Sequence, residues 1–262
     1  TFLLSAFLIS RLALPDAARR AKKKENGDNG KRIDFAQTFR ELKEGWQFIF
    51  VNPVVRSVNL GLATGLIGGG MVVPLGSIFA RDILGAGAAG YGVFITSLGF
   101  GVATGVVLLS VTQKKLPLVR MFELSIFGAG GTLIFSASMS TLSLTIIGVF
   151  LLGICGGAVY VVGFTLLHEN VDDELRGRIF SALYTIVRLC LLIAFALGPF
   201  LSELLDRLSN RLFTDRTVSL LGRDLFVPGE RITLWLAGGI ILIAGMVVYW
   251  SLRAGTREDQ KI

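Results

Sequence analysis

The feature that most constrains this chain is a series of long apolar runs, each close to the length of a membrane crossing. Six complete runs lie at about 54–80, 91–111, 121–139, 142–166, 179–204 and 232–252. A helix needs about 20 apolar residues to cross a hydrocarbon core roughly 30 Å thick. We therefore predict an all-α, polytopic membrane protein whose residues 54–253 form a bundle of six transmembrane helices.

The amino-acid composition agrees with this prediction. Hydrophobic residues make up 52% of the chain and charged residues 17%, which would leave a water-soluble protein with too little polar surface. A lipid bilayer is therefore the expected partner. The net charge of +7 is concentrated beside apolar runs, as at residues 19–24, and basic residues there usually set membrane orientation. No nucleic-acid recognition motif accompanies them, so nucleic acid is not an expected partner.

The residues outside the bundle divide into three parts. Residues 1–14 are apolar but too short to span, and we interpret them as the end of a truncated transmembrane helix. Residues 15–53 are predicted to form a cytoplasmic central loop with an amphipathic surface helix, which begins at a capping box of Asp34 and Gln37. Residues 254–262 form the tail. On this interpretation the six complete runs are helices seven to twelve of a twelve-helix protein.

The distribution of lysine and arginine predicts the orientation. Successive loops alternate sides, and the basic residues favour the loops at 11–43, 113–120 and 176–178 and the tail at 253–261. The opposite loops include 205–231, where arginines are offset by carboxylates and where residues 218–227 suggest a small hairpin. By the positive-inside rule, we expect a multi-pass protein of the cell (inner) membrane, with both ends of the bundle on the cytoplasmic side.

The sequence offers little for enzymatic chemistry. Cys155 and Cys190 lie inside apolar runs, and His168 is the one histidine. Neither a metal-ligand spacing nor a phosphate-binding loop occurs. We therefore predict no catalytic residue, no metal site and no cofactor.

Arg188 is the polar residue that most suggests a function. It lies about nine positions into the fifth run, roughly 13 Å along a helix, where a cation costs at least about 2.5 kcal/mol unless it meets water or a partner. Tyr184 and Thr185 precede it at helical spacing, as does Ser181. One interpretation is a lining for an aqueous substrate path; the other is a structural pair with a carbonyl group or with a carboxylate elsewhere. The predicted substrate-cavity residues are Arg188, Tyr184, Asn59, Tyr160 and Thr185.

Glycines recur inside the runs and have two interpretations. Gly68, Gly69 and Gly70 precede Pro74 in the first run, which predicts either a helix bend or a close helix crossing. Other glycines are interpreted as packing positions that let helix backbones approach each other: Gly99, Gly101, Gly105, Gly153, Gly156 and Gly157.

Several stretches resemble one family, the drug and macrolide exporter branch of the major facilitator superfamily. The most specific is TLLHENVDDELRGRIF at residues 165–180, and the others are EGWQFI at 44–49, NPVVR at 52–56, RDILG at 81–85 and GYG at 90–92. The resemblance makes residues 165–180 a cytoplasmic loop motif carried by Glu169, Asp173, Arg176 and Arg178. It also makes Gly198 and Pro199 a helix bend, like Gly69 and Pro74. The chain departs from the family at His168 and Asp172, where glutamine and proline are usual.

The resemblance implies secondary active export of a small amphipathic molecule. An amino-terminal six-helix half would complete the fold, and an ion gradient, with the proton as coupling ion, would drive alternating access. The first, second, fourth and fifth complete helices would line the cavity. An alternative stays open, because the chain also resembles the membrane part of proteins that fuse such a domain to a thymidylate kinase. In that case it would be a non-transporting anchor for a soluble nucleotide kinase.

Overall fold

The computed structural model describes residues 52–112, 117–171, 173–212, 217–220 and 223–258, all of which belong to one compact unit. The predicted truncated helix at 1–14, nearly all of the predicted loop and surface helix at 15–53, and the end of the tail lie outside the described residues.

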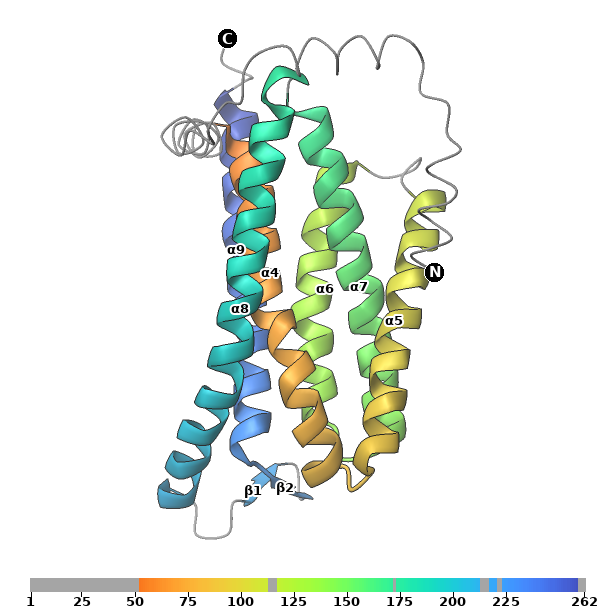
Figure 1. Ribbon diagram of the computed structural model, residues 1–262, viewed down its shortest axis with the longest axis vertical. Helices are drawn as coiled ribbons and strands as arrows, with labels where there is room; N and C mark the ends of the chain where they lie inside the picture. The colour runs from red at the N-terminus through yellow and green to blue at the C-terminus, as the bar shows by residue number, and fades with distance from the viewer. Residues whose placement is uncertain (1–51, 113–116, 172, 213–216, 221–222, 259–262) are drawn as a thin grey trace, which may run out of the picture. The chain divides into compact units, whose positions relative to one another are not determined.

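Long helices dominate the described part of the chain (Figure 1). In chain order they are α4 (Pro53–Ile78), α5 (Gly87–Thr112), α6 (Leu118–Ser138), α7 (Leu142–Glu169), α8 (Asp173–Leu212) and α9 (Gly229–Glu258). A π-helical turn, η1 (Phe79–Ile83), extends α4, and strands β1 (Thr217–Leu220) and β2 (Arg223–Phe226) pair in antiparallel fashion between α8 and α9. This pairing confirms the hairpin expected between residues 218 and 227.

Within the described residues, six helices are long and apolar enough to cross a membrane. The all-α prediction is confirmed, and the chain is a multi-pass membrane protein. The helices are longer than the apolar runs at several ends, because polar residues can continue a helix beyond the bilayer. α8 begins with the polar residues Asp173 and Glu174, before its apolar run. The motif residues Arg176 and Arg178 therefore lie inside α8 and not in a loop.

Local sequence explains both ends of α4. The Oδ1 atom of Asn52 accepts hydrogen bonds from the backbone N–H groups of Val54 at 3.0 Å and Val55 at 3.1 Å, and Pro53 occupies the first helical position. This is a favourable N-cap. At the other end Gly85 and Gly87 have φ angles of 61° and 58°, which only glycine adopts readily. They allow the short turn from η1 into α5.

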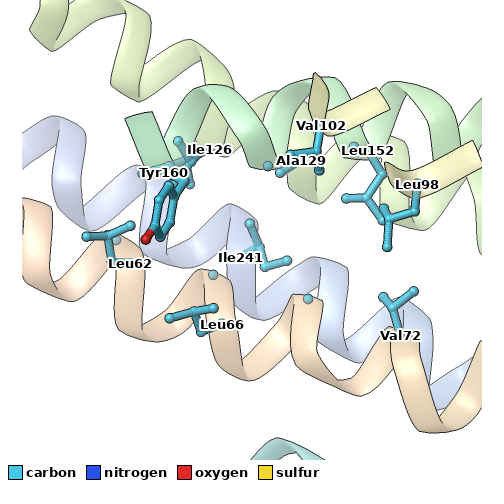
Figure 2. A pocket seen from close by; sticks show the side chains of 16 residues that line it. Leu62, Leu66, Val72, Leu98, Val102, Ile126, Ala129, Leu152, Tyr160 and Ile241 are labelled. Atoms are coloured by element: carbon cyan, nitrogen blue, oxygen red, sulfur yellow. The ribbon is translucent and has the colours of Figure 1, made fainter. Parts of the chain in front are cut away.

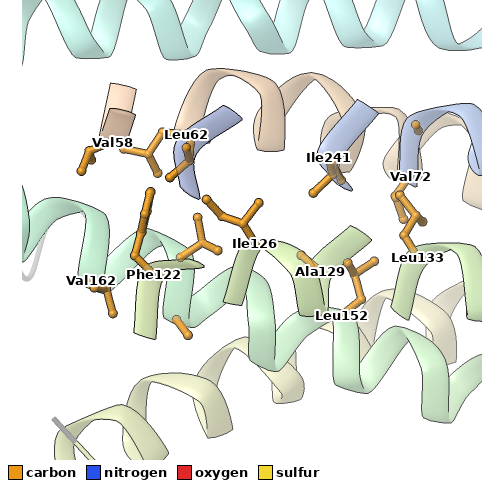
Figure 3. Packing of buried hydrophobic residues seen from close by; sticks show 14 of the residues in the cluster. Val58, Leu62, Val72, Phe122, Ile126, Ala129, Leu133, Leu152, Val162 and Ile241 are labelled. Atoms are coloured by element: carbon orange, nitrogen blue, oxygen red, sulfur yellow. The ribbon is translucent and has the colours of Figure 1, made fainter. Parts of the chain in front are cut away.

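The centre of the bundle is built by α4 and α7. Buried side chains from α4, α6, α7 and α9 interdigitate there, among them Leu62, Phe122, Ile126, Val162 and Ile241 (Figure 3). Against this centre, α9 and α8 pack on α4, whereas α5 and α6 pack on α7. α5 and α8 are the least buried of the six helices.

These neighbour relations repeat when the helices α4, α5 and α6 are exchanged for α7, α8 and α9. The contact of α5 with α7 corresponds to that of α8 with α4, and the contact of α6 with α7 corresponds to that of α9 with α4. The contacts of α4 with α7 and of α6 with α9 are unchanged by the exchange. The main exception is the contact of α8 with α9, since α5 and α6 share no comparable contact. The weaker contacts of α4 with α5 and with α6 also have no counterpart for α7. Each triplet has three helices that can cross the membrane, so the chain ends the first triplet on the side opposite to where it began. The second triplet therefore runs through the membrane in the opposite direction. The strongest helix contacts therefore follow the pattern of an inverted repeat of three helices.

Candidate functional site

A cavity lies in the space between α4 and α7, and we call it the α4–α7 crevice (Figure 2). Its volume is about 200 Å³. Leu62 and Leu66 of α4 form one wall, and Leu152 of α7 lies on the other. α5, α6 and α9 complete the lining with Val102, Ala129, Ile241 and other apolar residues. The crevice is therefore suited to an apolar group.

Glycines create the space in the crevice. A Cβ atom added at Gly65, Gly69 or Gly156 would have no neighbour within 4 Å, so these positions form hollows in the two walls. The packing prediction is accordingly wrong for Gly156, and it is also wrong for Gly99, which faces open space on α5. Both lie on helix faces that no other helix covers closely.

Other glycines do allow helices to approach. Gly101, Gly105, Gly153 and Gly157 each lie so close to the opposite backbone of α5 or α7 that a Cβ would overlap it, which confirms the packing prediction for them. In α4 the close-crossing interpretation holds for Gly68, whose added Cβ would lie 2.8 Å from the carbonyl oxygen of Ala237 in α9. It also holds for Gly70, against Ala194 of α8 at 2.9 Å.

Tyr160 carries the one side-chain polar group among the described residues that line the crevice. Figure 2 shows its ring reaching from α7 towards Leu62 and Leu66 of α4. The side chain is 52% exposed. Its hydroxyl group can therefore meet both a molecule in the crevice and the surroundings of the bundle.

Aromatic rings continue from Tyr160 to α8. The ring centroids of Tyr160 and Phe164 are 4.5 Å apart, and that of Phe164 lies 6.1 Å from Tyr184 and 5.7 Å from Phe180. His168 lies 4.6 Å from Phe180. Because the backbones of α7 and α8 do not pack closely, these five rings, which we call the aromatic bridge, connect the two helices. The structure thus brings the predicted residues Tyr160 and Tyr184 together.

Arg188 lies one helical turn beyond Tyr184, on an exposed stripe that also contains Thr185 and Ser181. The Thr185 hydroxyl donates to the carbonyl oxygen of Ser181 at 2.9 Å. Arg188 is exposed and takes part in no hydrogen bond or ion pair within the described residues. Its helix segment, Gly177–Ser209, is long and apolar enough to cross a membrane, and the exposed guanidinium lies within that segment.

Of the remaining predicted residues, only Gly69 lies at the crevice. Asn59 is only 4% exposed and does not line the crevice. Its Nδ2 donates to the Val55 carbonyl at 2.8 Å, and its Oδ1 has no hydrogen-bond partner among the described residues.

The predicted bend and loop residues lie at several places in the bundle. Pro74 and Pro199 lie inside the continuous helices α4 and α8. Glu169 ends α7 and Asp173 begins α8. Gly69 lines the crevice, whereas Gly198 packs beside Met71 of α4.

Arg231 is the most buried cation of the described residues, and its burial was not predicted from the sequence, which placed it in an outer loop. α9 already begins at Gly229, and Arg231 has no exposed surface. Its guanidinium donates to the carbonyl oxygens of Phe226 at 2.6 Å and Met139 at 3.0 Å and to the Ser140 hydroxyl at 3.1 Å. These bonds join the hairpin to the turn between α6 and α7, which indicates a structural role. The sequence signal was its position next to the last apolar run.

The described residues of the site offer groups for binding an apolar or charged molecule. Among the residues the structure describes, no group of three or more histidine, cysteine, aspartate and glutamate side chains could hold a metal ion. Cys155 and Cys190 are free thiols. No protein-family profile matches the chain, and no curated protein sequence does. The arrangement itself provides an apolar crevice with the Tyr160 hydroxyl group, a row of rings that includes Tyr184, and the exposed cation of Arg188.

Proposed function

We propose that this multi-pass membrane protein is one six-helix half of a secondary active transporter of the major facilitator superfamily, in the drug and macrolide exporter branch. A second six-helix bundle would complete the fold, with both ends of this bundle in the cytoplasm. A small amphipathic molecule would cross by alternating access, driven by an ion gradient with the proton as coupling ion. The observation that carries the proposal is the inverted-repeat pattern in the contacts of α4–α6 and α7–α9.

An inverted repeat suits a transporter for a physical reason. Two triplets that cross the membrane in opposite directions can exchange their conformations, so that a structure open to one side implies a related structure open to the other. Many transporter folds contain such repeats, including the three-plus-three repeats inside each half of major facilitator proteins. The substrate sites of such folds lie near the bilayer midplane, at the interface between repeats. In this chain the α4–α7 crevice lies between the two triplets.

The exposed Arg188 gives independent support. A guanidinium in contact with lipid tails at this depth costs at least about 2.5 kcal/mol, so the stripe with Tyr184 and Thr185 has to face water or polypeptide. Tyr160, at the crevice, and Tyr184, on this stripe, belong to the same aromatic bridge. A water-filled path between two bundles would satisfy the guanidinium.

Thiol labelling of the full-length protein in membranes tests this proposal. Cys155 and Cys190 are first replaced by alanine, and Arg188→Cys is then exposed to a membrane-impermeant methanethiosulfonate reagent. We expect rapid labelling, at a rate that changes when an ion gradient is imposed. The matched control is Ile243→Cys, because Ile243 is 67% exposed on α9 and is expected to face lipid and stay unlabelled.

Two outcomes would contradict the proposal. If the thiol at position 188 stays unlabelled from both sides of the membrane, Arg188 does not line a water path. If it is labelled but the rate is the same with and without a gradient, the helices do not alternate. Either result would favour the non-transporting anchor for a fused enzyme.

A further inference from the structure

We infer that the α4–α7 crevice, the aromatic bridge and Arg188 together bind an organic anion with an aromatic or aliphatic body. The inference rests on the proposed function, because it names the substrate class of that same site. The body of the molecule would occupy the crevice and the rings, and its acidic group would meet the guanidinium.

The three parts lie close enough to act on one molecule. Tyr160 lines the crevice and belongs to the aromatic bridge, which ends at Tyr184, one turn before Arg188. α7 and α8 run in opposite directions from the turn that joins them (Figure 1). Gly156 precedes Asn170 by 14 residues and Arg188 follows Asp173 by 15, which puts both roughly 20 Å from the turn. The cation therefore lies at the same height in the bundle as the crevice.

The size and chemistry of the crevice select the body of the ligand. A drug-sized molecule usually needs a pocket of roughly 300–1,000 Å³, whereas the crevice holds about 200 Å³. It therefore takes one apolar part of a larger ligand or a small ring system. The exposed rings of Tyr160 and Tyr184 offer π faces on which an aromatic group can stack.

The charge of the site selects the acidic group. Along α8 the nearest carboxylates to Arg188 are Glu174 and Glu203, 14 and 15 residues away, or roughly 20 Å. Glu203 is moreover paired with Arg207. A guanidinium binds a carboxylate or sulfonate through two parallel hydrogen bonds, and more strongly where water is scarce. The same charge repels organic cations, so the expected preference is for anions over neutral molecules.

The competing interpretation is that Arg188 pairs permanently with a carboxylate of another bundle. Such a pair would neutralise the guanidinium and leave no preference for an anion. It would also make removal of Arg188 destabilising, because the remaining carboxylate would be buried alone.

The experiment compares two probes of equal shape, 2-naphthoate and its neutral isostere 2-naphthamide. Their equilibrium binding to the full-length protein in lipid nanodiscs is measured with radiolabelled compounds, and empty nanodiscs are subtracted. We expect 2-naphthoate to bind at least tenfold more tightly. Arg188→Gln should abolish this difference, and Arg188→Lys should retain a preference for the anion.

A second variant tests the crevice. Gly156→Leu adds a side chain where no atom lies within 4 Å of the new Cβ, so it should fill the crevice and weaken both probes at least tenfold. Gly131→Leu is its matched control: Gly131 is exposed on α6, has equally open surroundings and does not line the crevice. It should leave both affinities unchanged.

Several results would overturn the inference. These are equal affinities of the two probes for the unmodified protein, an anion preference that survives in Arg188→Gln, or no saturable binding at all. Thermal unfolding of each variant checks that it is folded. If the unmodified protein shows no preference for the anion while the thiol of Arg188→Cys is accessible to water, the substrate class alone is rejected. An inaccessible thiol would reject the proposed function as well.

Discussion

α7 has two faces that carry glycine, and the two faces do opposite things. Towards α5, Gly153 approaches Gly101, Gly157 approaches Val102, and Gly105 of α5 approaches Ile154. A Cβ at any of these four glycines would overlap the opposite backbone. Towards α4, Gly156 faces Gly65 and Gly69 across the crevice, where a Cβ would meet nothing within 4 Å. We call the first region the α5–α7 interface.

The difference teaches that the function of a glycine in this bundle is decided by its neighbour. At the α5–α7 interface the absence of a side chain lets two backbones approach, which maximises dispersion contacts where lipid provides no hydrophobic driving force. At the crevice the same absence leaves room that no protein atom fills. The following predictions separate the two regions, beginning with the largest effect.

The largest effect is expected for valine at the α5–α7 interface. In Gly153→Val the new Cβ would lie 2.9 Å from the Cα atom of Gly101, and two further methyl groups would follow. We expect the free energy of unfolding to fall by about 3 kcal/mol, the upper end of overpacking effects. Thermal unfolding in detergent measures this, with Gly156→Val, one turn away, as the control. If both variants lose equal stability, the two faces do not differ.

Alanine on α5 should give a smaller effect of the same kind. In Gly105→Ala the Cβ would lie 2.9 Å from the Cα atom of Ile154, so the helices must separate, at a cost of about 2 kcal/mol. Gly99→Ala lies on the same helix and meets nothing within 4 Å. It should instead stabilise α5 slightly, by up to about 1 kcal/mol, because alanine favours the helix. A shared loss measured by thermal unfolding would argue against the close approach of α5 and α7.

Accessibility should distinguish the crevice from the packed core. In the background without native cysteines, we expect Gly69→Cys to react with a small maleimide at least tenfold faster than Ser57→Cys. Both positions lie on α4, but Gly69 lines the crevice and Ser57 is only 1% exposed. The rates are followed by mass spectrometry. Equal rates would show that the crevice is closed in the membrane.

The smallest effect concerns the contact of α6 with α7, which is intermediate between the two regions. A Cβ at Gly128 would lie 2.7 Å from the Sγ atom of Cys155, the movable end of a side chain. We expect Gly128→Ala to cost about 1 kcal/mol and Cys155→Ala to remove most of that cost in the double variant. A double-mutant cycle of unfolding free energies measures the coupling. Additive effects would mean that the two residues do not touch.

The transmembrane helices could be predicted from the sequence, whereas the role of individual residues in them could not. Runs such as 142–166 correspond to α7 because the cost of exposing an apolar segment to water depends on that segment alone. The position of Arg188 inside an apolar run was likewise read from the sequence, whereas its exposure on the surface of the bundle came from the structure. Phe164 of the aromatic bridge was not predicted, since that residue looks like any other apolar residue of its run.

The sequence by itself determined that this chain enters a bilayer, how many times its described part crosses it, and that a cation lies at membrane depth. Only the tertiary structure decided that Arg231 is buried among carbonyl groups, that Gly157 packs against α5 while Gly156 lines a crevice, and that Tyr160 and Tyr184 share one row of rings. The reason is that transfer from water to lipid is a local property of a segment. Packing depends on which surface a distant helix presents, and that surface exists only once the bundle has formed.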